Sequence, residues 1–228
     1  MSVLRVTATL AAPIVADEEI HLDALLIAAR PGPGTRPTRS TPVAEITYPP
    51  LPIGRIAAHG AWTYACSTWQ LPQEARGGRE HLTKRRDAAD VDNSAKAFTP
   101  NSGRGRNYLL PLPTIETPAV WWTVVGRRGP LKKLLRYVPA IGSKRRHGYG
   151  RVLRWDVELS DADPLCAFVF TGRANRWLPA SWVVYASSVD NGPVIPPYWH
   201  PGLCVDRVRP GQLVTLHSEV LAKIKELS

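Results

Sequence analysis

Prolines constrain the fold of this chain more than any other feature of its sequence. There are 22 of them among 228 residues, about twice the usual share of ~5%. A proline fixes φ and removes a backbone donor, so it disrupts helix interiors and central strands. Since the prolines are spread along the chain, short strands joined by rigid loops are favoured over long helices. The 44% of hydrophobic residues exclude wholesale disorder.

Local patterns predict short strands that alternate with helices. An acidic triplet at residues 17–19 marks a helix start, and Pro130 suits the first position of another helix. Trp121 and Trp122 are adjacent in one strand, so they point to opposite faces and one is expected in the core. The expected strands are residues 3–10, 43–48, 55–70 (with a turn at 59–60), 107–116, 119–125, 151–159, 183–185 and 212–216, and the expected helices are residues 20–29, 129–138 and 217–227.

The order of these elements predicts an α+β fold in a single domain over residues 1–228. Two strand–helix–strand halves favour a ferredoxin-like (RRM-like) sandwich, with helices on one face of an antiparallel sheet. Residues 72–106 are polar, glycine-rich and mixed in charge. They are interpreted as an inserted loop or hairpin, because a loop of this length is usually functional or disordered. After residue 160 we expect a proline-rich, irregular part.

The positive charge of the chain is concentrated in one segment. The 29 Lys and Arg outnumber the 19 Asp and Glu, for a net charge of +10. Residues 117–155 contain no acidic residue, and they carry the whole excess. The basic residues of this segment are Arg127, Arg128, Lys132, Lys133, Arg136, Lys144, Arg145, Arg146, Arg151 and Arg154. This concentration predicts a polyanionic partner.

Residues 140–150, here called the glycine loop, combine this charge with three glycines. Gly142, Gly148 and Gly150 permit backbone conformations that other residues resist, so backbone N–H groups can face an anion. The side chains suited to nucleic acid are Lys144, Arg145 and Arg146 for phosphates, and Tyr149 and the nearby Trp155 for stacking on bases. The loop is not a P-loop, because no GK[ST] opens a helix, and a Rossmann glycine loop would follow a strand rather than a helix.

A helix, a Gly- and Lys/Arg-rich loop that ends in G-x-G, and a following strand resemble the RAMP superfamily of CRISPR-associated RNA-binding proteins. The chain is most similar to the small RAMP subunit of type IV effector complexes. The similarity lies in the HLDALL segment at residues 21–26 and in residues 116–152. The second stretch is the specific part of the resemblance.

The resemblance implies a ferredoxin-like RAMP fold and a non-catalytic subunit of a type IV CRISPR ribonucleoprotein that serves antiviral defence. Such a subunit grips the 5′ handle of the crRNA and caps the backbone filament. The implied partners are the crRNA, the backbone and large subunits and, through the complex, target DNA. Residues 72–106 are the candidate for an inserted thumb that wedges between bases.

The candidate RNA-binding residues come from two sources. The resemblance carries over to Gly142, Lys144, Arg145, Arg146, Gly148, Tyr149 and Gly150. Position and charge add Ser143, His147, Arg127, Arg128, Lys84, Arg85 and Arg86.

Two other functions stay open. A RAMP-fold endoribonuclease that processes precursor crRNA would use a histidine as general acid or base. His21 and His147 are the candidates, and Tyr149 or Lys144 would assist, but no complete base–acid pair is evident. The third function is that of a basic scaffold protein that binds nucleic acid non-specifically.

No cofactor and no metal site is expected. Cys66, Cys166 and Cys204 are far apart and form no CxxC, and His200 with Cys204 supplies only two of the four ligands of a structural zinc. Asp23 lacks a second carboxylate, so it is expected to accept hydrogen bonds locally. The N-terminus lacks the features of a secretion signal, and no apolar run reaches ~18 residues. A cytoplasmic, prokaryotic protein without a membrane partner is therefore expected.

Overall fold

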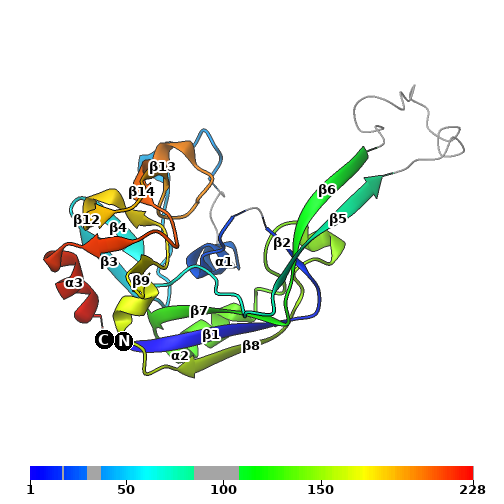
Figure 1. The fold of residues 1–228 in the computed structure, drawn as a ribbon, viewed down its shortest axis with the longest axis horizontal. Helices are drawn as coiled ribbons and strands as arrows, with labels where there is room; N and C mark the ends of the chain where they lie inside the picture. The colour runs from blue at the N-terminus through cyan, green and yellow to red at the C-terminus, as the bar shows by residue number, and fades with distance from the viewer. Residues whose placement is uncertain (17, 30–36, 85–107, 228) are drawn as a thin grey trace, which may run out of the picture.

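A three-stranded antiparallel sheet forms the lower part of the molecule in Figure 1. Strand β1 (Ser2–Leu10) lies between β7 (Ala119–Gly126) and β8 (Val152–Leu159). The computed structural model describes residues 1–16, 18–29, 37–84 and 108–227. Within them the protein has mixed α and β content, and every strand pair is antiparallel.

An irregular fourth strand borders this sheet along β7. Residues 65–70 run antiparallel to β7, with bridges from Cys66 to Val124 and from Gln70 to Trp121. The Ser67 N–H donates to the Thr123 carbonyl at 2.8 Å, and the Gln70 N–H donates to the Trp121 carbonyl at 2.7 Å. The order across the sheet is therefore β8, β1, β7 and residues 65–70.

Helices α1 (Leu22–Ala29) and α2 (Arg128–Leu135) share a core with the sheet. Alternate residues of β1 point into that core, as the period of two in a strand requires. The buried residues of β1, α1 and α2 in this cluster are Leu4, Val6, Ala8, Leu10, Leu22, Leu25, Leu26, Leu131 and Leu135. Trp122 is fully buried in the same cluster, whereas Trp121 lies on the opposite face under the Arg5 guanidinium. The predicted division between the two tryptophans is confirmed.

A second core lies in the upper left part of Figure 1 and is built from short elements. It includes the fully buried Trp182 and Val220, and the ring of Phe168 lies 6.4 Å from that of Trp182 between centroids. Val3 and Val125 of the sheet also belong to it, so the two cores adjoin. The strands and the helix that contribute to it are β3 (Arg55–Ala58), β4 (Ala61–Tyr64), β9 (Val169–Phe170), β10 (Arg173–Ala174), β11 (Leu178–Pro179), β12 (Val183–Ala186), β14 (Cys204–Val208), β15 (Val214–Leu216) and α3 (Ser218–Lys225). Strand β13 (Asp190–Pro193) pairs with β14.

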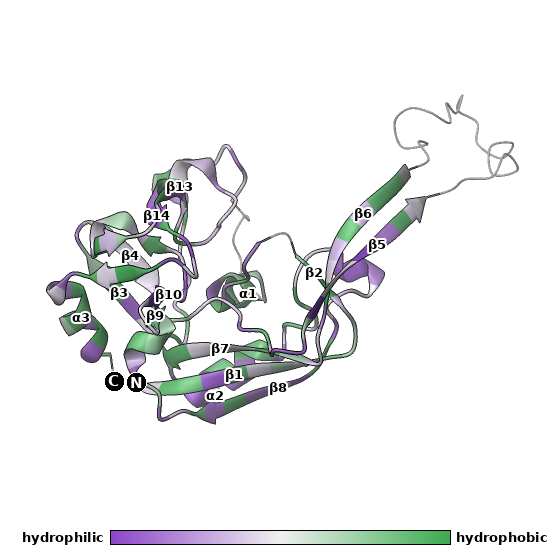
Figure 2. Cartoon of the chain, in the orientation of Figure 1, coloured by the Kyte–Doolittle hydropathy of each residue, from purple (hydrophilic) through white to green (hydrophobic). Residues whose placement is uncertain are grey.

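A two-stranded arm projects from the body of the protein (Figure 1). It consists of β5 (Arg76–Lys84) and β6 (Tyr108–Glu116), paired from Arg76 opposite Glu116 to Lys84 opposite Tyr108. Strand β2 (Ile14–Val15) pairs with the base of β6. The first part of the predicted insertion is thus a strand, while residues 85–107 lie outside the described part of the chain. Figure 2 shows apolar residues along the arm, and the side chain of Leu109 is 63% exposed.

Two local predictions are wrong. Residues 43–48 do not form a strand, because Glu45 and Ile46 donate back to the carbonyls of Pro42 and Val43 in a 3-10 turn, η1 (Val43–Glu45). The first helix begins at Leu22 rather than beside the acidic triplet. Asp23 is the acidic residue in its first turn, and it accepts a hydrogen bond from the Ala24 N–H at 2.8 Å.

A fully buried ion pair joins α1 to the second core. The Arg176 Nη2 atom lies 3.5 Å from the Asp23 Oδ2 atom, and the Tyr198 hydroxyl donates to the same oxygen at 2.8 Å. Arg176 also donates to the carbonyls of Tyr64 and Cys66. Burial raises the pKa of Asp23, and the charge of Arg176 opposes that rise. The expected role of Asp23 as a hydrogen-bond acceptor is confirmed.

We predict that Arg176→Met lowers the free energy of unfolding by about 3–5 kcal/mol, because it leaves Asp23 as an uncompensated buried charge. Urea unfolding followed by tryptophan fluorescence measures this loss. Arg154→Gln is the control, since it breaks the exposed pair with Asp156 and is expected to cost at most about 1 kcal/mol. Similar small losses in both variants would contradict the prediction.

Candidate nucleic-acid interface

The glycine loop connects α2 to β8, as predicted, and its base is fixed to the segment that carries β2. The Ser143 N–H donates to the Val15 carbonyl at 2.7 Å, and the Gly150 N–H donates to the Pro13 carbonyl at 2.7 Å. Across the loop, the Ile141 N–H donates to the Gly150 carbonyl at 2.9 Å. Since β2 also pairs with β6, one short strand anchors both the glycine loop and the arm.

Two glycines are required by this anchoring. Gly142 has φ +82°, and a Cβ there would lie 2.5 Å from the Val15 carbonyl oxygen. Gly150 has φ +63°, and a Cβ there would overlap the Ile141 carbonyl oxygen. Gly148 also has positive φ, but open space surrounds the position of its missing Cβ. Lys144 adopts a left-handed conformation with φ +55°, which is uncommon for a residue with a side chain.

The basic side chains at the tip of the glycine loop are available to a ligand. A 3-10 turn, η4 (Arg145–His147), presents Arg145, Arg146 and His147 to solvent, and Lys144 is half-buried. None of the ion pairs in the described part of the chain involves Lys144, Arg145 or Arg146. Their charges are therefore free to neutralise phosphates and to release the counterions bound there.

The aromatic residues predicted to stack on bases have contacts within the protein. The Tyr149 hydroxyl donates to the Glu80 Oε2 atom at 2.5 Å, and this hydrogen bond raises the pKa of Tyr149. Tyr149 thus connects the glycine loop to β5 of the arm. Trp155 donates its indole N–H to the Val138 carbonyl at 2.9 Å and lies 5.8 Å from Trp122 between ring centroids. It packs against the first core.

The other predicted RNA-binding residues lie apart from the glycine loop. Arg127 and Arg128 stand at the start of α2, and the loop follows its end, so a helix of about 12 Å separates them. Arg127 is exposed, whereas the Arg128 Nε atom donates to the Val157 carbonyl at 2.8 Å. Lys84 ends β5, and Arg85 and Arg86 lie outside the described residues.

The two candidate catalytic histidines have different environments. His21 is 1% exposed, and its ring lies 4.8 Å from that of Trp177 and 4.9 Å from that of Tyr198. Burial lowers the pKa of His21 well below its usual value, and Arg176 and Arg207 lower it further. Its burial thus favours the neutral form of His21, while His147 is exposed at the end of η4. No hydrogen bond joins the two within the described residues.

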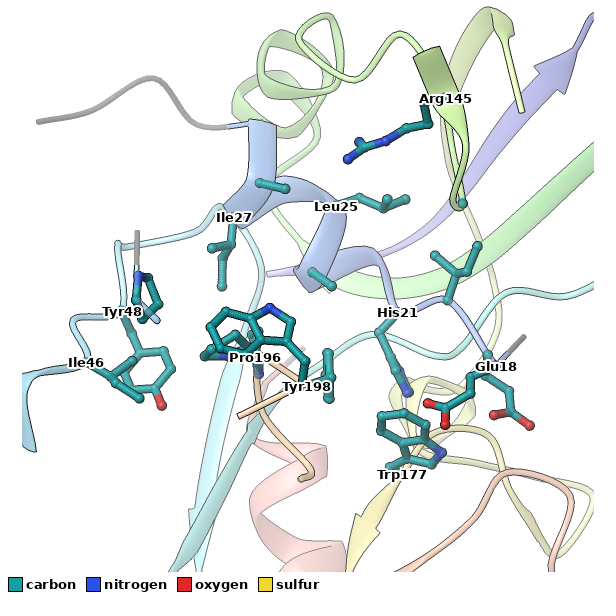
Figure 3. A pocket seen from close by; sticks show the side chains of 18 of the residues that line it. Glu18, His21, Leu25, Ile27, Ile46, Tyr48, Arg145, Trp177, Pro196 and Tyr198 are labelled. Carbon is teal, nitrogen blue, oxygen red and sulfur yellow. The ribbon is translucent and has the colours of Figure 1, made fainter. Parts of the chain in front are cut away.

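A cavity of about 470 Å³ lies beside the glycine loop. Figure 3 shows Arg145 reaching from the glycine loop toward α1, and His21 beside Trp177 and Glu18. The lining residues that matter for its chemistry are His21, Tyr48, Arg145, Trp177, Tyr198 and Trp199. Local sequence patterns do not predict this cavity, because its walls come from segments far apart in the chain. The aromatic run at residues 198–199 was the one local signal.

The described residues contain no group of three or more His, Cys, Asp or Glu side chains that could hold a metal ion. Cys66 is buried, Cys204 is exposed, and all three cysteines are free. Burial raises the pKa of the Cys66 thiol to about 12. No helix in the described ranges is long and apolar enough to cross a membrane.

The glycine loop lies in a part of the chain that matches the model of a known protein family. Residues 73–205 match the model of the family described as CRISPR type IV associated protein Csf3. The matched range is more than half of the chain, and it contains the arm, α2, the glycine loop and β8. It also contains residues 160–205, for which sequence analysis found no motif, whereas the HLDALL segment lies outside it. A search of curated proteins finds no match.

We predict that Gly150→Ala disrupts the glycine loop and that Gly148→Ala does not. Both substitutions impose a left-handed conformation on alanine, at about 1–2 kcal/mol. Gly150→Ala must also displace the Ile141 backbone, so its loss in free energy of unfolding is expected to be at least twice that of Gly148→Ala. Urea unfolding of both variants measures the difference, and equal losses would mean that the loop is not held as described.

Proposed function

This chain belongs to the Csf3 family of type IV CRISPR-associated proteins, and we propose that it binds the 5′ handle of the crRNA within a type IV complex. In this proposal it does not cleave the RNA, and it caps the end of the backbone filament. Its partners are the crRNA and the backbone and large subunits, and it meets target DNA only through the complex. It acts in the cytoplasm of a prokaryotic cell.

The topology supports a RAMP fold of the ferredoxin-like type. The chain order β1, α1, residues 65–70, β7, α2 and β8 is the β-α-β-β-α-β order of that fold. Both helices share one core with the sheet. The glycine loop follows the second helix and enters the last strand, which is the place that the resemblance to RAMP proteins implies. Residues 76–84 of the expected thumb form strand β5 of the arm.

The glycine loop is the observation that carries the proposal. Its base is fixed by hydrogen bonds to residues 13–15. Its tip presents Lys144, Arg145 and Arg146, none of which forms an ion pair with another described residue. A rigid base with unpaired cations is suited to a polyanion, since little order must be gained on binding. The net charge of +10 adds long-range attraction that draws RNA to the surface.

We predict that replacing Lys144, Arg145 and Arg146 together by Gln weakens binding of repeat-handle RNA on the order of tenfold or more, because each charge-assisted hydrogen bond contributes about 1.5–3 kcal/mol. The slope of log K against log salt is expected to fall by about 1 for each phosphate that is no longer neutralised. Fluorescence anisotropy with labelled RNA at several salt concentrations measures both quantities.

The matched control replaces Lys132 and Lys133 of α2 and Arg136 at its C-cap by Gln. This variant removes the same charge from an exposed helix face, and its affinity is expected to fall less. Equal reductions in the two variants, together with equal binding of scrambled RNA of the same length by the unmodified protein, would favour the non-specific scaffold instead.

We predict that the protein leaves repeat RNA intact in the presence of EDTA. His21 is enclosed between two aromatic rings and His147 stands in solvent, so the two do not form an acid–base pair. Denaturing gels of labelled repeat RNA test this. Cleavage by the unmodified protein that disappears in His147→Ala would establish the endoribonuclease in place of the non-catalytic subunit.

A further inference from the structure

We propose that the cavity beside the glycine loop receives one unstacked nucleobase of the bound RNA, while Arg145 contacts the phosphate next to it. The inference rests on the proposed binding of RNA and specifies how a single nucleotide is held. The cavity volume of about 470 Å³ lies within the range of small-ligand sites, about 300–1,000 Å³.

Continuity with the glycine loop is the first argument. Gly142 and Arg145 belong to the loop, and both line the cavity. An RNA backbone that follows the cations of the loop would therefore pass the mouth of the cavity. A base that leaves the stack at this point can enter the cavity while the glycine loop holds the phosphate of the same nucleotide. Single-stranded RNA is commonly recognised by bases that are splayed out in this way.

The aromatic wall is the second argument. Trp199 is 49% exposed, although it lines the cavity. One face of Trp177 is covered by the Arg207 guanidinium, 4.0 Å from the ring centroid, and Tyr198 stacks on His21. Trp199 is thus the ring with surface left for a ligand. Stacking of a base on such a ring contributes about 1–3 kcal/mol.

Unsatisfied polar atoms inside the cavity wall are the third argument, because a base that draws these side chains toward it would give them partners and an apolar protein side chain would not. Both ring nitrogens of His21, the hydroxyl of Tyr48 and the indole N–H of Trp177 are buried, and each lacks a hydrogen-bond partner among the described residues. All three residues line the cavity. Leaving a buried donor or acceptor unpaired costs about 1–3 kcal/mol. A neutral imidazole offers one donor and one acceptor, and the edge of a base would pair with them once the His21 ring turns toward the cavity.

Acidic residues at the cavity favour a base with an exocyclic amine. Glu18 and Glu19 line the cavity, as does His21. A carboxylate accepts hydrogen bonds from amino groups such as N4 of cytosine. It repels the carbonyl oxygens of uracil. The base in the cavity is therefore expected to be adenine, cytosine or guanine.

The test is an abasic scan of repeat-handle RNA, in which each nucleotide in turn loses its base. With the unmodified protein, removal of one base is expected to weaken binding about 5- to 150-fold. Replacement of that base by uracil is expected to have a similar effect. Ala28→Trp places a bulky ring in the cavity, since Ala28 lines it. In this variant the intact RNA should bind as weakly as the abasic RNA, with no further weakening on base removal.

Two other variants keep the test decisive. Ala222→Trp adds the same bulk at an exposed position of α3 and should behave as the unmodified protein. Trp199→Ala removes the stacking surface without filling the cavity, so it should reduce the penalty at the same nucleotide. If Ala28→Trp does not fold, Trp199→Ala alone tests whether the base binds in the cavity.

Three outcomes would overturn the inference while the proposed function stands. In the first, every nucleotide shows the same small penalty. In the second, one large penalty persists unchanged in Ala28→Trp and Trp199→Ala. In the third, these variants no longer capture the backbone subunit but keep their affinity for RNA, which would assign the cavity to a protein side chain. If handle RNA is not preferred at all, the proposed function itself fails.

Discussion

The buried pair of Asp23 and Arg176 is the interaction on which the arrangement of the two cores depends. It joins α1 of the first core to residues 174–178, whose Ala174 and Leu178 belong to the second core. Burying two charges is costly, and it is tolerated only where further hydrogen bonds complete the site. The Tyr198 hydroxyl and the carbonyls of Tyr64 and Cys66 supply them. The sequence neighbours of this network, His21, Trp177 and Trp199, line the cavity, so the pair also positions the proposed base site.

The glycine loop and the arm share one anchor, which explains how distant parts of the chain converge on one face. Strand β2 pairs with β6 on one side and forms a bridge from Val15 to Ser143 on the other. The hydrogen bond between Tyr149 and Glu80 adds a second connection. A polyanion at the loop would therefore contact a surface whose geometry is set before binding. This lowers the entropy cost of recognition.

Sequence patterns predicted the elements whose structure depends on near neighbours. Leu131, Leu134 and Leu135 of α2 pack as their spacing requires, with Leu134 half-buried and the other two buried. The helix ends at Leu135, before the predicted end at residue 138, and Val138 is buried in the turn that follows. The glycine loop was predicted because its glycines and cations are contiguous in sequence. The strand predicted at residues 43–48 does not form, because the backbone N–H groups of Glu45 and Ile46 donate to carbonyls three residues earlier. Residues 65–70 complete the sheet through long-range pairing. The Asp23–Arg176 pair and the cavity likewise depend on residues far apart in the chain, so no local pattern reveals them.

The central claim is that the glycine loop grips the 5′ handle of a crRNA. The most direct measurement is photo-crosslinking of the RNA that co-purifies with the tagged chain when its neighbouring genes are co-expressed, followed by sequencing of the RNA and mass spectrometry of the linked peptides. The account predicts transcripts of the repeat array, with handle nucleotides linked to residues 140–150. Random cellular RNA, or handle nucleotides linked only to other surfaces of the chain, would contradict it.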